Sequence, residues 1–316
     1  DNEERINSQL IEQNVIKQEN LIYILNTETK EAKIIGNENA SGEIVIPRYI
    51  KHETENYTVT NVLQGAFEDS KTIQSIIIPP DSEIKKIEKS AFSNSTIERF
   101  IILSNAIELC EGWCSNTPNL KYISISPKNN IYIYIDSKMI LGKSDLNKDE
   151  YDILVFVNRN VKDILIPSFI SQIAPYAFDY SNIEHIIIPS KVTKIGKGAF
   201  DHCQNLVSIK FQKNSKLQII ENGAIPKYLI KSIIFPECYV NLNSLNSEEM
   251  ATSVLAAKNT EFIYSNEMNY DIIETNTFSK IIQKIKNKIS NSSRFEAKEI
   301  YRYCDKYFSS RIPLLV

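Results

Sequence analysis

The segment Ile186–Cys203 reads IIIPSKVTKIGKGAFDHC and joins two short phrases that recur along the chain. The first phrase is an apolar residue, two variable residues and then Ile-x-Ile-Pro. The full phrase begins at Ile73, Val161 and Ile183, and looser copies begin at Gly42, Ile97, Leu120, Leu206 and Ile230. From residue 73 onward the first apolar position therefore falls at 73, 97, 120, 161, 183, 206 and 230. Successive spacings are 24, 23, 41, 22, 23 and 24 residues, so one interval is close to double the others.

The second phrase, apolar-x-x-apolar-x-x-x-Ala-Phe, keeps step with the first. It ends at Ala66-Phe67, Ala91-Phe92, Ala177-Phe178 and Ala199-Phe200, with Ala224-Ile225 as a variant. Two phrases that stay in phase across about eight units indicate a repeat architecture rather than a single central core.

Side-chain chemistry predicts the path of one repeat. The alternation in Ile-x-Ile turns two side chains to one face, as in a short strand, and proline ends that strand. The Ala-Phe phrase then returns along the opposite side, where Ala permits close approach and Phe fills the space between coils. One coil cannot bury its own apolar side, so the coils stack. We therefore expect about eight parallel strands, starting near residues 42, 73, 97, 120, 161, 183, 206 and 230.

These repeats resemble the BspA-like, or Treponema-type, class of the leucine-rich repeat superfamily, whose repeat of about 23 residues carries Ile-x-Ile-Pro followed by Ile-Gly-x-x-Ala-Phe. The resemblance covers roughly residues 42–240. It implies a repeat solenoid, a right-handed leucine-rich-repeat superhelix with one parallel sheet. It also implies a role in binding, often as a surface protein or adhesin of host-associated microbes.

The ends of the chain lie outside the repeats. Residues 1–41 predict an N-terminal cap, built on a hairpin of Leu21–Leu25 and Lys33–Ile35, because an open solenoid end exposes apolar side chains. Residues 42–240 form the expected solenoid. Residues 241–316 predict a helical C-terminal segment, whose basic stretch 278–311 has a net charge of +6. That stretch is either a solvated face of packed helices or a contact for an acidic partner or membrane surface.

The long interval predicts an island insertion at about residues 128–158. Tyr132–Ile135, Lys138–Lys143 and Tyr151–Val157 are its expected strands, and Ser144–Glu150 is a polar loop. Structural elaboration is the favoured interpretation, with a binding loop as the alternative.

Composition argues against a catalytic function and against nucleic-acid binding. The chain has 316 residues, a net charge of −3, and only 8 Gly, 3 His and 1 Trp. It lacks phosphate-binding, dinucleotide-binding, serine-hydrolase and zinc-protease motifs. Asp201-His202-Cys203 resembles a dyad in text but follows Ala199-Phe200, where every copy turns. We therefore predict no enzymatic activity, no cofactor, no metal and no transmembrane segment.

Cysteine usage predicts reduced thiols rather than a disulfide framework, because five cysteines are scattered over a long chain. Cys110 and Cys114 could supply half a metal site, but no histidine lies within 50 residues of them, so core thiols are favoured. In this third unit the second phrase is aligned as Ile107…Cys110, and Trp113 is expected to replace the missing Phe as a core filler.

Strand phase predicts a binding surface. The residue between the two Ile of each strand faces outward, which selects Val45, Ile77, Ile101, Ser124, Leu165, Ile187, Lys210 and Ile234. The column two residues earlier is polar and varied, and includes Arg99, Tyr122 and His185. An apolar row beside a polar row is typical of a contact surface, although Ile and Val suit any strand. The predicted ligand-binding residues are Val45, Ile77, Arg99, Ile101, Tyr122, Leu165, His185, Ile187, Lys210 and Ile234.

The favoured function is non-enzymatic binding or adhesion, with the strand face presented to a protein or glycan ligand, host-derived in one version of the hypothesis. The expected location is the cell surface or the secreted fraction, with the cytoplasm as the alternative. The competing hypothesis is an intracellular scaffold or self-assembling structural protein, whose basic C-terminal helices contact an acidic partner or a membrane surface.

Overall fold

The structure is a computed structural model that describes residues 14–105, 107–230, 233 and 236. The chain divides into two compact units. Unit 1 comprises Asp1–Ile131 with Asn158–Asn160, and unit 2 comprises Tyr132–Val157 with Val161–Val316. Among the described residues, no helix has the length and apolarity needed to cross a membrane.

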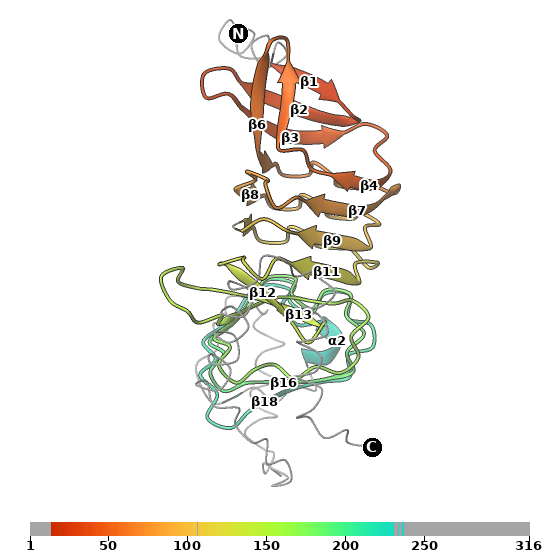
Figure 1. Ribbon diagram of the computed structural model, residues 1–316. Helices are drawn as coiled ribbons and strands as arrows, with labels where there is room; N and C mark the ends of the chain where they lie inside the picture. The colour runs from red at the N-terminus through yellow and green to blue at the C-terminus, as the bar shows by residue number, and fades with distance from the viewer. Residues whose placement is uncertain (1–13, 106, 231–232, 234–235, 237–316) are drawn as a thin grey trace, which may run out of the picture. The chain divides into compact units, whose positions relative to one another are not determined.

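Unit 1 carries one parallel strand per coil, as the first phrase predicts (Figure 1). The strands are β4 (Gly42–Val45), β7 (Ile73–Ile78), β9 (Arg99–Ile102) and β11 (Tyr122–Ile125), hydrogen-bonded in the order β11-β9-β7-β4. Ile76 pairs with Ile44 on one side and with Phe100 on the other. Ile76 and Phe100 are fully buried, so this column faces the core.

A second sheet runs along the other side of unit 1. Its antiparallel part is β1 (Val15–Gln18), β2 (Leu21–Asn26) and β3 (Glu31–Asn37). Its parallel part continues from β3 through β6 (Glu55–Val62) and β8 (Lys86–Ile87) to β10 (Glu108–Leu109). The β2–β3 pair is the hairpin expected near the N-terminus. Strand β5 (Tyr49–His52) forms a further hairpin with β6, which the repeat pattern does not predict.

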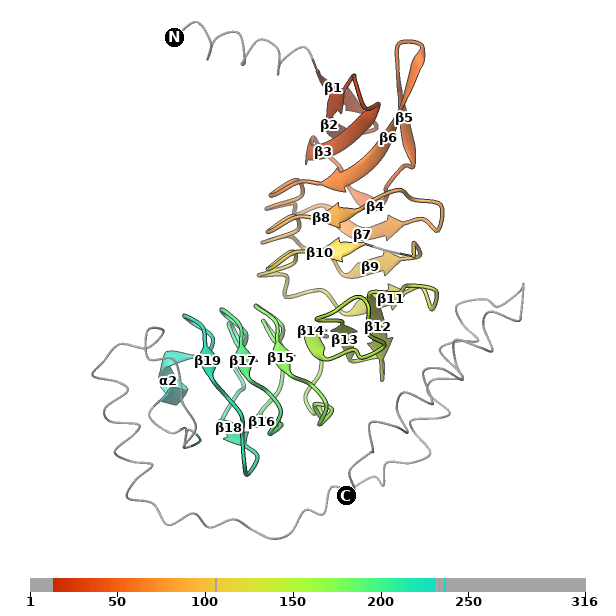
Figure 2. The ribbon, with the colours of Figure 1, turned by 90° about the vertical axis from the view of Figure 1, so that its left-hand side faces the viewer.

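Unit 2 repeats this plan, with a second sheet of six strands. Strands β12 (Tyr132–Ile135), β13 (Met139–Gly142) and β14 (Ile153–Val157) are antiparallel and occupy the segments expected for the island. The sheet then continues in parallel through β15 (Gln172–Ile173), β17 (Lys194–Ile195) and β19 (Ile219–Ile220), which lie side by side in Figure 2. Strands β16 (His185–Ile188) and β18 (Ser208–Phe211) form the two-stranded sheet opposite.

The solenoid is therefore confirmed, but the sheet arrangement differs in detail from the expectation. The first-phrase strands form a four-stranded sheet in unit 1 and a two-stranded sheet in unit 2, and short second-phrase strands form parallel ladders of their own. The predicted strand near Val161 is wrong, because residues 161–167 belong to no strand. The carbonyl of Asp163 instead accepts a hydrogen bond from the ammonium group of Lys138, at 3.0 Å.

The predicted strand that begins near residue 230 falls mostly outside the described residues, and a short helix, α2 (Lys227–Ile230), comes directly before them. Proline at 226 precedes it, and proline is favourable at a helix start because its fixed φ suits the first turn. The predicted helical segment 241–316, with its basic stretch, lies outside the described residues, as does Ile234.

Candidate functional site

The outward column of the unit 1 strand face is brought into register by the ladder. Val45 pairs with Ile77, Ile77 with Ile101, and Ile101 with Ser124. Val45 is 51% exposed, while Ile77, Ile101 and Ser124 are partly exposed. Parallel strands lie about 4.8 Å apart. The apolar side chains of Val45, Ile77 and Ile101 thus form a continuous, solvent-accessible row, and the Ser124 hydroxyl follows at its end.

The neighbouring column of the same face holds the polar groups. Glu43 pairs with Ser75, Ser75 with Arg99, and Arg99 with Tyr122. The Arg99 guanidinium lies 5.3 Å from the centre of the Tyr122 ring, and both side chains are exposed. Such a cation–π pair holds a flat aromatic surface beside a positive charge. Ser75, in contrast, is buried, so this column is not polar and exposed along its whole length.

The predicted residues of unit 2 lie on a shorter face. Ile187 pairs with Lys210, and His185 pairs with Ser208. His185 Nδ1 and Ser208 Oγ are 2.9 Å apart, so this polar column is tied by a hydrogen bond. Leu165 is 54% exposed but belongs to no strand, so the structure does not extend the ladder to it.

The sequence correctly places Asp201-His202-Cys203 in a turn, but it misses what the turn assembles. His202 has a φ of 51°, and Asp69, Asn94, Asn116 and Tyr180 hold matching positions in other coils with φ of 55–59°. The His202 ring stacks on Tyr180, with ring centres 4.3 Å apart. Its Nδ1 is 2.9 Å from Oδ1 of Asp179, which is fully buried. Burial, and then the charges of Asp179 and Asp201, raise the pKa of Tyr180 above its ordinary value.

This cluster has the geometry of a structural corner. The Cys203 thiol donates to the carbonyl of Phe178, at 3.0 Å, and contacts the Ser181 hydroxyl at 3.4 Å. Cys203 is buried, so its thiol is engaged within the corner and shielded from solvent. The sequence did contain a signal for this cluster. Asp179-Tyr180-Ser181 lies one repeat before Asp201-His202-Cys203 and supplies the residues that His202 and Cys203 contact.

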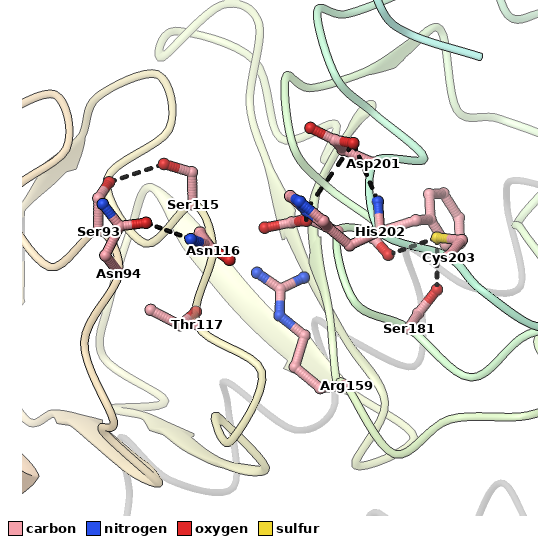
Figure 3. A network of polar contacts seen from close by, with 12 residues as sticks. Ser93, Asn94, Ser115, Asn116, Thr117, Arg159, Ser181, Asp201, His202 and Cys203 are labelled. Carbon is pink, nitrogen blue, oxygen red and sulfur yellow. Dashed lines mark hydrogen bonds and ion pairs between the residues drawn. The ribbon is translucent and has the colours of Figure 1, made fainter. Parts of the chain in front are cut away.

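The matching corner of unit 1 is a polar ladder (Figure 3). Ser93 Oγ and Ser115 Oγ are 2.7 Å apart, and the Asn116 amide donates to the Asn94 amide oxygen. Figure 3 also shows the contacts of His202 and Cys203 in unit 2. Equivalent side chains of adjacent coils therefore bond each other at this corner, a periodic arrangement that stabilises the stack.

The two cysteines considered for a metal occupy different environments. Cys114 is buried, as expected of a core thiol, and its carbonyl accepts a hydrogen bond from the buried Arg159 at 3.3 Å. Cys110 is partly exposed and lies near Glu108 and Lys86. Partial burial raises the pKa of the Cys110 thiol above its ordinary value, and Lys86 opposes that shift. Within the described part of the chain, no three metal-ligating side chains converge.

Comparison with known proteins identifies the repeat. The family model described as the BspA type leucine rich repeat region matches residues 48–147 and 154–253 in six copies, which is more than half of the chain. No curated protein matches the chain significantly.

The chain also matches several solved structures at low sequence identity. The pneumococcal vaccine antigen PcpA is 17% identical, with a TM-score of 0.29, over 67% of this chain and 73% of that one. A leucine rich cell surface protein from Faecalibacterium prausnitzii is 15% identical, with a TM-score of 0.28, over 78% and 98%. A leucine-rich repeat protein from Eubacterium ventriosum is 14% identical, with a TM-score of 0.36, over 66% and 78%.

Proposed function

Because the chain belongs to the BspA-type leucine-rich repeat family, we propose that it is a non-enzymatic binding protein whose strand face receives a protein or glycan ligand. Repeat solenoids present extended surfaces of this kind, because each coil adds one strand to a continuous face. The family also supports a location at the cell surface or in the secreted fraction, where the protein acts in adhesion.

One observation carries the proposal: the outward row Val45–Ile77–Ile101 is apolar although it is not part of the core. A sheet face that only meets water favours polar residues at such positions. Here the apolar row stands beside the exposed Arg99 and Tyr122, and Arg and Tyr are enriched where proteins bind partners. The β-propensity of Ile and Val favours the same residues, so the proposal requires a binding test.

The test places a charge in the row without disturbing the core. Ile101→Lys and Ile187→Lys each alter an outward, partly exposed position of a first-phrase strand, one in each unit. Ile35→Lys is the matched control, because Ile35 is also partly exposed but lies on β3 of the other sheet. Binding is measured on arrays of purified glycans and extracellular-matrix proteins, and folding is followed by circular dichroism.

We expect Ile101→Lys to weaken binding to the array ligands of the parent by about tenfold or more, as at the centre of an interface. Ile35→Lys should leave binding unchanged. A folded Ile101→Lys, Ile187→Lys double variant that keeps every ligand at parental affinity would exclude the strand face.

A further inference from the structure

A second surface, separate from the strand face, stands out by its charge. Residues 185–220 contain six lysines, no arginine and one acidic residue, Asp201. The lysines follow a spacing of three in each of two consecutive coils, at 191, 194 and 197 and at 210, 213 and 216. The segment is strongly basic, whereas the whole chain has a net charge of −3.

The fold brings three of these lysines to one edge of unit 2, in the turns between the first and second phrases. The backbone N–H of Lys216 donates to the carbonyl of Ser190, at 2.8 Å, which places Lys216 beside Lys191 on the adjacent coil. The Gln212 side chain accepts from the backbone N–H of Ser190, at 3.0 Å, so the turn that holds Lys213 is tied to the same place. Lys191, Lys213 and Lys216 are all exposed, and we call them the lysine edge.

The carboxylate of Glu221, which follows the lysine-rich segment, is bonded to other groups. Glu221 binds the ammonium of Lys194 at 2.5 Å and accepts from the backbone N–H of Lys197 at 2.8 Å. Partial burial of Glu221 opposes ionisation, but these bonds outweigh it and hold the pKa of Glu221 below its ordinary value. Among the described residues, no carboxylate forms an ion pair with a side chain of the lysine edge.

Unit 1 provides an internal contrast, because its equivalent turns carry both signs of charge. Glu83 precedes Ile84 in the second phrase as Lys191 precedes Val192, and Glu83 pairs with Arg48 at 2.7 Å. Lys85 pairs with Glu31 in the same way, at 2.7 Å. The coil geometry therefore allows ion pairs in these turns. The lysine edge carries no such pairs because of the residues that the sequence of unit 2 places there.

We propose that the lysine edge binds a linear acidic polysaccharide through its sulfate or carboxylate groups. Clustered exposed ammonium groups repel one another, and a polyanion relieves that repulsion. Lysine contacts an anion as a mobile point charge, without the bidentate geometry of arginine, which suits the irregular sulfation of such chains.

The same edge lacks the groups that other polyanions require. Single-stranded nucleic acids stack their bases on exposed aromatic rings, and membranes receive apolar side chains beside the basic ones. Within residues 186–220, the one strongly exposed large hydrophobic side chain is Val207, which comes before β18, whereas Lys213 and Lys216 follow that strand. Acidic glycans need neither feature.

The experiment uses the full chain and immobilised heparin, with hyaluronan as a carboxylate-only probe and dextran as a neutral one. The edge variant is Lys191→Gln, Lys213→Gln, Lys216→Gln. The matched control, Lys51→Gln, Lys89→Gln, Lys128→Gln, removes the same charge from exposed lysines of unit 1. A third variant, Lys280→Gln, Lys284→Gln, Lys288→Gln, removes the same charge from the C-terminal basic stretch.

We expect the parent to bind heparin at low salt and release it as salt rises, because exposed charges are screened. The edge variant should bind heparin about tenfold more weakly than the parent, because it loses three modest ion contacts. The affinity of the control variant should stay within about twofold of the parent. Ile101→Lys should leave heparin binding intact, so failure of this site and failure of the strand face are distinguishable.

Three outcomes would overturn the assignment. The first is a parent that binds dextran as well as heparin, or neither. The second is an equal loss of heparin affinity in the edge and control variants, which would mean that only net charge matters. A loss of heparin affinity confined to the C-terminal variant would count against the lysine edge in the same way. The third is preferential binding of poly-dT or phosphatidylserine vesicles by the lysine edge, which would assign it to nucleic acid or to a membrane instead.

Discussion

Each Ala-Phe corner sets one aromatic ring against the ring of the next coil. Phe178 and Phe200 stack with centres 4.8 Å apart, and Phe67 and Phe92 stack at 5.1 Å. The backbone N–H of Phe178 donates to the carbonyl of Ala199, at 2.8 Å. These rings are fully buried, so each stacked pair joins two adjacent coils.

Phe178→Ala should therefore lower the free energy of unfolding by about 3–5 kcal/mol, the cost of truncating a buried aromatic residue. Denaturant unfolding measures it. Val207→Ala, at a side chain that is 61% exposed, is the control and should change stability by less than about 0.5 kcal/mol. An unchanged midpoint for Phe178→Ala would mean that the repeat register is misplaced.

Asp152 is a residue whose ionisation supports the fold. It accepts hydrogen bonds from the Ser171 hydroxyl at 2.6 Å and from the Ser144 hydroxyl at 2.8 Å. Partial burial alone would raise its pKa, but these bonds lower the pKa of Asp152 below its ordinary value. A carboxyl group whose pKa is lower in the folded state stabilises the fold above the unfolded value, near pH 4, and that contribution is lost as pH falls through the folded value.

Asp152→Asn should accordingly destabilise the protein at pH 7, by less than about 1 kcal/mol because the carboxylate is partly exposed to solvent. The difference from the parent should shrink as pH falls below about 4. Urea unfolding at pH 7 and at pH 3 gives the comparison. A difference that grew at pH 3 would contradict the assigned sign.

At the scale of single elements, the third coil shows how a repeat absorbs a missing residue. The backbone N–H of Phe92 donates to the carbonyl of Trp113, as Phe67 donates to Ala91, so Trp113 holds the Ala position. Cys114 then holds the Phe position. The large and the small side chain exchange places, and the Trp113 ring packs 4.6 Å from that of Phe100. Such a volume-conserving exchange is tolerated in a core.

The same register corrects the alignment of the second phrase in that coil. Leu109, not Cys110, pairs with Ile87 in the ladder, and Leu109 is buried whereas Cys110 is partly exposed. The alignment of Cys110 as an inward residue was wrong by one position, because Leu109 takes that place, whereas Ile107 is buried as the phrase predicts. Trp113 is nevertheless the core filler that was predicted.

Leu109→Ala should cost about 2–5 kcal/mol of unfolding free energy, whereas Cys110→Ala should cost well under half of that. Thermal unfolding of the two variants under identical conditions tests the register directly. The reverse ranking would restore Cys110 as the inward position.

For the whole molecule, stability is distributed over neighbouring coils. Each unit carries its own aromatic stack, Phe67–Phe92 in unit 1 and Phe178–Phe200 in unit 2. In a repeat protein the folding energy is approximately a sum of coil terms and nearest-neighbour terms. A cavity in one stack should thus weaken nearby coils first.

Hydrogen–deuterium exchange can resolve this distribution. Phe178→Ala should accelerate exchange in β15, β17 and β19 more than in β7 and β9, and Phe92→Ala should show the opposite pattern. Equal acceleration of all strands by either variant would indicate a single cooperative unit.

The repeat, its period and most of the inward positions follow from the sequence alone. Alternation of Ile with other residues, the closing proline and the Ala-Phe corner are local constraints, and they act in the same way wherever they recur. The exposed apolar row was predicted for the same reason, since strand phase decides which side chains face outward, and the structure keeps Val45, Ile77 and Ile101 in one register.

Tertiary structure decided the contacts between coils, because these contacts depend on which residues the adjacent coil supplies. Residues 161–167 read as a strand but form none, and the Asp163 carbonyl there accepts a hydrogen bond from Lys138, 25 residues earlier in the chain. The pairing of His202 with Asp179 and the grouping of Lys191 with Lys216 both join residues about one repeat apart. Sequence gives the period of such contacts, but the hydrogen-bond register between coils determines which side chains meet.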